Sequence, residues 1–128
     1  MRLLLDTHAL AWWLLDNPRL PDRVRLIVED TDNTIFASAI SAYEAAYKHR
    51  IGKWPEVGPL VAAFEEIVAS QGLELLPISG KHATRAGLYA IDHGDPFDRM
   101  LAAQAEVDDL LVATNDRRFA DFGTRVVW

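Results

Sequence analysis

The chain is 128 residues long, half of them hydrophobic and a quarter charged, and it has no cysteine. Its size and composition predict one globular domain over residues 1–128, and the lack of thiols excludes disulfides, zinc–thiolate sites, iron–sulfur clusters and thiol nucleophiles. No apolar run approaches the about 20 residues of a membrane span, and the start MRLLLD lacks signal-peptide features, so we expect a cytoplasmic protein without a membrane partner.

Short apolar segments in the chain have the length and composition of buried strands. The first of them, residues 3–5, is the uninterrupted run LLL and ends at Asp6. Runs of this kind, without the alternation of a half-exposed strand, are typical of parallel sheets covered on both faces. In chain order, the predicted strands are residues 3–5, 34–37, 73–78, 110–113 and 124–127.

Helical segments alternate with these strands, and glycine, proline and asparagine mark the breaks between them. In chain order, the predicted helices are residues 7–16, a segment that begins at Pro21, residues 38–50, 57–70, 81–91 and 96–107, and a short helical turn at 117–121. Alternating strands and helices imply right-handed crossovers. We therefore expect an α/β fold: a three-layer α/β/α sandwich with a mostly parallel sheet of about five strands.

Four acidic residues that are distant in sequence fall at one edge of this predicted sheet. In open α/β sheets, reactive groups collect at the carboxyl ends of strands and at the starts of the helices that follow. Asp6 ends the first strand, and Asp116 follows the fourth. Glu44 lies in the first half of the helix after the second strand, and Asp98 lies in the first turn of the helix before the fourth.

Each of these acids also has a purely structural explanation, which the sequence leaves open. Asp6 and Asp116 could cap the helical turns that follow them. Glu44 could form a capping box with Ser41, and Asp98 could simply complement the dipole at the start of its helix.

The joint placement of the four acids favours a metal site. Two carboxylates about 4 Å apart repel each other by roughly 4 kcal/mol at an effective dielectric constant near 20, so several at one rim require a cation. The ligands are hard oxygens without a His or Cys cluster, which favours Mg²⁺ or Mn²⁺ over Zn²⁺. The net charge of −6 argues against a nucleic-acid partner. Without these four residues, however, only 15 acidic residues face 13 basic ones, and the objection mostly disappears.

Four blocks of the sequence resemble the PIN-domain toxins of bacterial toxin–antitoxin operons, the VapC type. They are MRLLLDTHALAWWLLDNPRL, SAISAYEAAYKHRIGKW, HGDPFDRMLAAQA and LLVATNDRRFADF, of which the third is the most specific. The resemblance implies an endoribonuclease toxin whose acidic cluster falls on Asp6, Glu44, Asp98 and Asp116. It also implies a VapB-like antitoxin that wraps the toxin and blocks its site, and a toxin homodimer.

The resemblance also assigns supporting roles around the cluster. Asp95 would support the site without direct contact, and Thr7 and Thr114, with Asn115 beside them, would orient carboxylates or waters. Basic residues near the acids could neutralise RNA phosphates, or they could form only a solvated charged face. These residues are Lys48, Arg50, Lys53, Arg99, Arg117 and Arg118. Among them, Arg99 could equally be a structural ion-pair partner of Asp98, and Lys48 a helix-surface partner of Glu44.

Two histidines and three tryptophans of the sequence also have candidate roles. For His8 and His93, a structural hydrogen bond is the simpler hypothesis, because a metal-activated water needs no imidazole. Trp12 and Trp13 are adjacent on a helix, so one of them should face outward. Together with Trp54 and Leu20, that tryptophan could mark a dimer or antitoxin surface.

The predicted reaction is hydrolysis of an RNA phosphodiester bond by a metal-activated water. One alternative is a phosphate-transfer enzyme or phosphatase of the haloacid dehalogenase type, but that class needs a second Asp where this chain has His8. A P-loop phosphate-binding site is not expected either, because the segment at Gly52 and Lys53 lacks the upstream glycine of that motif. A catalytically silent PIN-like binding module is the alternative from another class, and the intact set of acids argues against it.

Overall fold

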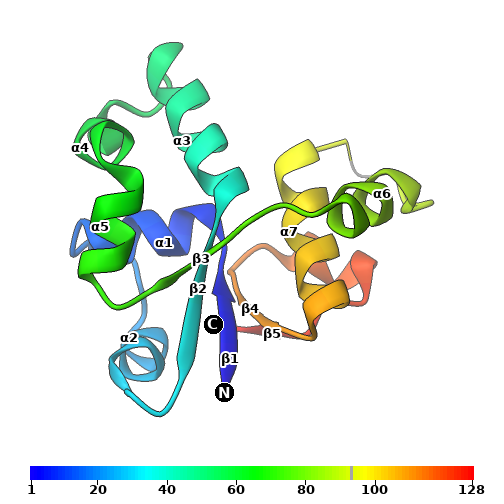
Figure 1. The fold of residues 1–128 in the computed structure, drawn as a ribbon, viewed down its shortest axis with the longest axis horizontal. Helices are drawn as coiled ribbons and strands as arrows, with labels where there is room; N and C mark the ends of the chain where they lie inside the picture. Colours follow the sequence, from blue (N-terminus) through cyan, green and yellow to red (C-terminus); the bar gives the residue numbers. More distant parts are fainter. Residues whose placement is uncertain (93) are drawn as a thin grey trace.

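The computed structural model describes residues 1–92 and 94–128, and the role predicted for His93 lies outside them. Among these residues, five strands form one sheet in the order β3-β2-β1-β4-β5, and every pairing is parallel (Figure 1). The strands are β1 (Arg2–Leu5), β2 (Thr34–Ser38), β3 (Glu74–Leu76), β4 (Leu111–Ala113) and β5 (Val126–Val127). The predicted parallel sheet is confirmed.

Strand β1 lies in the middle of the sheet, between β2 and β4. Leu4 is in register with Phe36 on one side and with Val112 on the other. Leu3 and Leu5 point to one face of the sheet and Leu4 to the opposite face, and all three are completely buried. A strand with helices over both faces has no exposed side, which explains why its sequence is a continuous apolar run.

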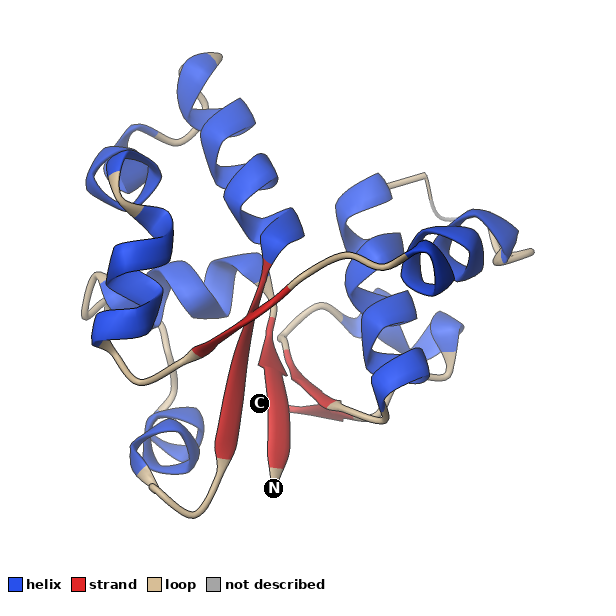
Figure 2. Cartoon of the chain, in the orientation of Figure 1, coloured by secondary structure: helices blue, strands red, loops and turns tan. Residues whose placement is uncertain are grey.

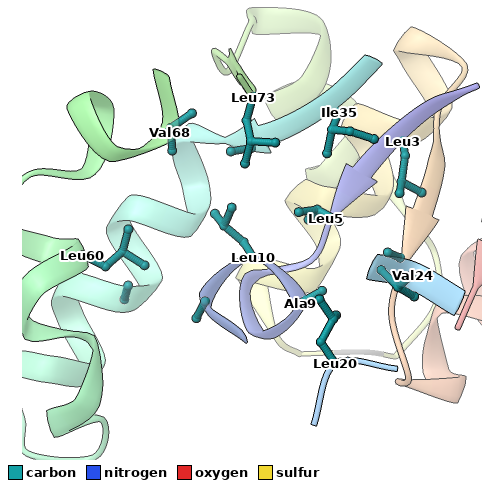
Figure 3. Packing of buried hydrophobic residues seen from close by; sticks show 14 of the residues in the cluster. Leu3, Leu5, Ala9, Leu10, Leu20, Val24, Ile35, Leu60, Val68 and Leu73 are labelled. Atoms are coloured by element: carbon teal, nitrogen blue, oxygen red, sulfur yellow. The ribbon is translucent and has the colours of Figure 1, made fainter. Parts of the chain in front are cut away.

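Helices cover both faces of this sheet (Figure 2). The α-helices are α1 (Thr7–Leu14), α2 (Asp22–Glu29), α3 (Ala39–Arg50), α4 (Gly58–Ala62), α5 (Phe64–Ser70), α6 (Gly80–Leu88) and α7 (Pro96–Asp108). Two 3-10 helices complete the described elements, η1 (Pro55–Val57) and η2 (Arg117–Phe122). On one face, side chains of α1, α2, α4 and α5 pack against Leu3 and Leu5 in a single apolar core (Figure 3). On the other face, α6, α7 and η2 pack against Leu4. The three-layer sandwich is therefore confirmed.

The segment 57–70 differs from its prediction as one continuous helix. The chain breaks at Ala63, where φ is −147° and ψ is 46°, and this separates α4 from α5. Helix α4 packs against α3, whereas α5 packs against β3. One straight helix could not make both contacts. Leu60, Phe64 and Val68 are all buried on the same core. Because these residues keep helical spacing across the break, periodicity could not reveal it.

Other boundaries move for local reasons. Helix α1 ends at Leu14 rather than at residue 16, because Asp16 adopts a left-handed φ of 51°. Strand β3 ends before Pro77, which has no N–H to donate to a neighbouring strand. Helix α6 ends at Leu88, three residues earlier than predicted, because the next residue leaves the helical conformation with ψ 123°. In the described part of the chain, no helix has the length and hydropathy of a membrane span.

Candidate active site

Acidic side chains line a cavity of about 540 Å³ at the carboxyl edge of the sheet. The strand order changes direction beside β1: the chain continues to β2 on one side, while β4 pairs on the other. Such switch points are where open α/β sheets place their ligands. The acidic residues of the lining are Asp6, Glu44, Asp95, Asp98 and Asp116, so all four predicted acids and the supporting Asp95 border the same space.

Asp6 lies at the end of β1 and caps helix α1. Its Oδ1 accepts a hydrogen bond of 2.8 Å from the Ala9 N–H, and its own N–H donates to the Ala113 carbonyl of β4 at 3.1 Å. The side chain is only 7% exposed, and this burial raises the pKa of Asp6, although hydrogen bonds from Thr114 and Ala9 act in the opposite direction. Asp6 is thus both a helix cap and a member of the cavity wall.

Thr114 connects two of the acids through one hydroxyl. The hydroxyl hydrogen-bonds Asp6, and it accepts a hydrogen bond of 3.0 Å from the Asp116 N–H. Thr7, by contrast, shares a hydrogen bond of 2.9 Å with the Ser41 hydroxyl, which joins α1 to α3. The role of orienting a carboxylate fits the contacts of Thr114, whereas those of Thr7 are between helices.

Glu44 comes from helix α3 and is 4% exposed. The predicted capping box with Ser41 is wrong, because the helix begins earlier: Ser38 is the N-cap and accepts a hydrogen bond of 3.0 Å from the Ile40 N–H. Glu44 instead forms an ion pair with Lys48, one turn further along α3. Helix capping therefore does not explain this buried carboxylate.

Asp95 and Asp98 lie at the start of α7. Asp95 is the N-cap and accepts hydrogen bonds from the N–H groups of Phe97 at 2.8 Å and Asp98 at 3.2 Å. The Asp98 side chain is 16% exposed. Burial, followed by the negative charges of Asp95, Asp116 and Glu44, raises the pKa of Asp98 to about 7. Near neutral pH, this carboxyl group is therefore poised to hold a proton or to gain from a nearby cation.

Asp116 lies directly after β4 and caps η2, as the structural alternative predicted. It accepts a hydrogen bond of 3.0 Å from the Arg118 N–H, and the Arg118 guanidinium pairs with its carboxylate at 2.8 Å. The same guanidinium lies 3.7 Å from Asp98. Asn115 also lines the cavity. One arginine thus bridges Asp98 in α7 and Asp116, the residue before η2.

The basic residues predicted to contact RNA fall into two groups. Lys48 and Arg118 line the cavity, whereas Arg50, Lys53, Arg99 and Arg117 do not. Arg99 was also expected as an alternative ion-pair partner of Asp98. Its guanidinium instead donates hydrogen bonds to the carbonyls of Ala86, Tyr89 and Ile91 at 3.0, 2.7 and 3.1 Å. These bonds hold the end of α6 and the residues that follow it against α7, which gives Arg99 a structural role outside the cavity.

The cavity also contains residues that the sequence did not assign to it. Arg19 lines it from the loop between α1 and α2, where no motif marks a binding residue. His8 and Trp12 belong to the same wall, and the His8 ring stacks on Trp54 with centroids 4.8 Å apart. Leu20, predicted at a partner surface, is 1% exposed and lies in the core. The sequence around Pro18 is mostly polar, so its pattern does not indicate that Leu20 is buried in the core while Arg19 lines the cavity.

The donor set has the chemistry that Mg²⁺ and Mn²⁺ prefer, namely carboxylate, hydroxyl and amide oxygens. Among the described residues, no three His, Asp or Glu side chains gather closely enough to form a ready metal cage. Glu44 and Asp116 are turned towards Lys48 and Arg118 instead. Mg²⁺ keeps several waters and needs only one or two direct carboxylates. The site therefore fits an ion that is held largely through water.

Comparisons with known proteins identify the fold and the family of the chain. The fold is similar to that of VapBC2 from Rickettsia felis bound to a DNA fragment from their promoter, with a TM-score of 0.71 and 19% sequence identity over 100% of this chain and 99% of the other. It is also similar to FitAcB from Neisseria gonorrhoeae, with a TM-score of 0.64 and 26% identity over 98% of this chain and 96% of the other. A third similar structure is VapBC-1 from nontypeable Haemophilus influenzae, with a TM-score of 0.62 and 14% identity over 99% of this chain and 97% of the other. No curated protein matches the chain. The model of the PIN domain matches residues 3–124, and the chain therefore belongs to the PIN-domain family.

Proposed function

We propose that this protein is a Mg²⁺- or Mn²⁺-dependent endoribonuclease and the toxin of a type II toxin–antitoxin pair. The observation that carries the proposal is the convergence of the acids on one cavity at the switch point of a PIN domain. Membership of the PIN family supports nuclease activity in general. The solved structures of similar fold, whose names include VapBC and FitAcB, support the assignment to a toxin of this kind.

In this proposal, Asp6, Asp98, Asp116 and Glu44 hold the divalent ion, directly or through waters. The chemistry that such an ion supplies when bound is polarisation of a phosphate oxygen and a lowered pKa for water. Asp6 is held in place by Ala9 and Thr114, which keeps its carboxylate in one orientation.

The cations of the cavity serve the substrate. Lys48 and Arg118 neutralise Glu44 and Asp116 in the free protein, and both side chains line the cavity. When RNA enters, its phosphates become alternative partners for these two groups. Asn115, which also lines the cavity, can donate a neutral hydrogen bond to the same phosphates.

We further propose an antitoxin and a second copy of this chain as protein partners. An apolar cavity of about 590 Å³ lies between α3 and α7 and is lined by Ile40, Tyr43, Tyr47, Pro96, Phe97 and Met100. Tyr43 is 65% exposed and Tyr47 41%. Exposed aromatic side chains around an apolar hollow are typical of protein interfaces. Light scattering of the purified chain, alone and with the product of the neighbouring gene, measures both associations.

The deciding experiment is an RNA-cleavage assay with controlled metal. The wild-type protein should cut RNA in Mg²⁺ or Mn²⁺, lose this activity in EDTA and regain it when Mn²⁺ is added. Asp98→Asn should abolish cleavage while the protein remains folded by circular dichroism. Equal activity in Asp98→Asn and wild type would refute the assignment of the site. Release of phosphate from a small phosphomonoester, with RNA intact, would favour the phosphatase alternative, and partner binding without any turnover would favour the binding module.

A further inference from the structure

One wall of the acidic cavity is aromatic. His8 and Trp12 belong to the lining together with the carboxylates. Both come from α1, the helix that Asp6 caps, so the rings are tied to the same short segment as a principal acid of the site. Their positions i and i+4 place them on one face of the helix, and their ring centroids are 5.8 Å apart. We call this pair of rings the aromatic wall.

Two further tryptophans pack against the aromatic wall. The indole of Trp54 stacks on His8 at 4.8 Å with an interplanar angle of 28°, and Trp128 packs against Trp12 at 5.9 Å with an angle of 58°. Trp54 and Trp128 also pack on the main core of the molecule. The rings of the wall are therefore fixed before any ligand arrives, and little side-chain freedom is left to lose on binding.

A cation lies on the same cavity. Arg19 is an exposed residue of the lining. Lys48 and Arg118, the other two cations of the lining, are held by carboxylates. Within the part of the chain that the structure describes, the Arg19 guanidinium has no carboxylate partner, so its charge is available to an anion from outside.

We propose that the aromatic wall and Arg19 form a subsite for one unpaired nucleotide of the RNA substrate, with its base stacked on the rings and its phosphate on Arg19. This inference rests on the proposed ribonuclease function and assigns to His8, Trp12 and Arg19 the binding of one base and its phosphate. A base within a duplex already stacks on its neighbours and cannot offer its face to a protein ring. Aromatic stacking is the usual way in which proteins hold single strands.

A nucleotide suits this subsite better than an apolar segment of a protein. The wall opens into a cavity bordered by carboxylates and cations, and a nucleotide brings a polarisable face, polar edges and a phosphate to those groups. A side chain such as Leu or Phe would bury the wall but leave Arg19 without an anion. The apolar hollow between α3 and α7 has the composition expected for a protein contact instead.

The test measures RNA binding and cleavage separately. Fluorescence anisotropy uses a labelled single-stranded octanucleotide with 2′-O-methyl and phosphorothioate groups, which resists hydrolysis, and the same strand annealed to its complement. Cleavage of an unmodified RNA octanucleotide in Mn²⁺ gives kcat and KM. The variants are Trp12→Leu, which removes the ring, Trp12→Phe, which keeps one, and His8→Ala at an exposed position. Leu26→Ala, an exposed apolar side chain on α2, is the control.

We expect wild type to prefer the single strand, and Trp12→Leu to weaken its binding on the order of 5- to 150-fold, the range for loss of one stacked base. KM should rise by a similar factor with a smaller change in kcat. Trp12→Phe should stay within about threefold of wild type, since any aromatic face can stack. His8→Ala should weaken binding in the same direction as Trp12→Leu, and Leu26→Ala should change nothing. Arg19→Gln should lower the slope of log affinity against log salt by about one.

Several results would overturn the subsite. One is that Trp12→Leu or His8→Ala, while folded, binds the single strand as tightly as wild type and has the same KM. Another is that wild type binds the duplex as tightly as the single strand. A loss of RNA binding in Tyr43→Leu with none in Trp12→Leu would place the bases on the α3–α7 side. If the KM of these variants is unchanged and they still cleave RNA, only this inference is refuted and the proposed ribonuclease function stands. Trp12-dependent binding in a protein that never cleaves RNA would support the subsite and refute the proposed catalysis.

Discussion

The guanidinium of Arg118 lies 3.7 Å from the carboxylate of Asp98, although the two residues belong to different helices. Arg118 also pairs with Asp116 at 2.8 Å. The side chain of Arg118 is 60% exposed, so solvent weakens its attraction for both acids. Lys48 pairs with Glu44, but this lysine and one screened arginine do not offset the combined negative charge of Asp6, Glu44, Asp95, Asp98 and Asp116. The metal-free cavity therefore carries an electrostatic penalty that can be measured.

Asp98→Asn should stabilise the metal-free protein. The substitution keeps the shape of the side chain but removes a charge that Asp95, Asp116 and Glu44 disfavour. After allowance for solvent screening and for a weaker interaction with the helix dipole, we expect a gain of about 1–3 kcal/mol at pH 8. Urea unfolding in EDTA measures it, with the exposed Asp32→Asn as the control. A loss of stability would mean that Asp98 acts mainly at the start of its helix.

The stability of the metal-free protein should depend on pH through the same carboxyl group. The pKa of Asp98 is raised from 3.8 to about 7, so the folded protein binds this proton more tightly than the unfolded chain. Its contribution is then full below pH about 4 and is lost as the pH rises to about 7. The difference in unfolding free energy between wild type and Asp98→Asn, measured from pH 4 to pH 8, isolates this effect. A difference that does not vary with pH would show that Asp98 has an ordinary pKa.

Divalent cations should raise the melting temperature of the wild-type protein. Binding to the folded state alone stabilises it by about 2.7 kcal/mol at a hundredfold excess over the dissociation constant. Mg²⁺ and Mn²⁺ should therefore shift the transition by several degrees, and the shift should shrink in Asp6→Asn and Asp98→Asn. Differential scanning fluorimetry with and without EDTA gives the result, and Asp32→Asn should respond like wild type. An equal shift in all variants would place the binding site elsewhere.

Thr114→Val should damage both stability and activity, although it changes the shape of the side chain very little. The variant leaves Asp6 without a hydrogen bond and the Asp116 N–H without its acceptor. Thr114 is buried, so we expect a loss of about 1–3 kcal/mol in urea unfolding. Thr114→Ser retains the hydroxyl and should recover most of the stability and the RNA cleavage. If the serine variant behaved like the valine variant, packing of the methyl group would be the cause.

The sequence was sufficient for the sheet and for the positions of the acids along it. The apolar run at residues 3–5, followed by Asp6, predicts a buried strand with an acid at its carboxyl end. Right-handed crossovers then place Asp116 at the same edge. The break at Ala63 could not be predicted, because it depends on the different directions in which α4 and α5 must pack.

The detailed pairing within the site was also beyond the sequence. Glu44 follows Ser41 at the spacing of a capping box, and only the start of α3 at Ser38 shows that this explanation is wrong. Arg99 and Arg118 both follow an acid by one or two positions. One binds backbone carbonyls and the other joins two carboxylates. Which neighbour a long side chain reaches depends on tertiary structure, and a charge pattern does not encode it.

The central position of β1 has a consequence for synthesis of the protein on the ribosome. This strand precedes the other four in the chain, yet Leu3 is paired on its second edge only when Leu111 has been made. Asp116 and Arg118 arrive later still. The acidic cavity is therefore complete only after Arg118 has left the exit tunnel, and a chain cut short before Asp116 would lack part of the proposed metal site.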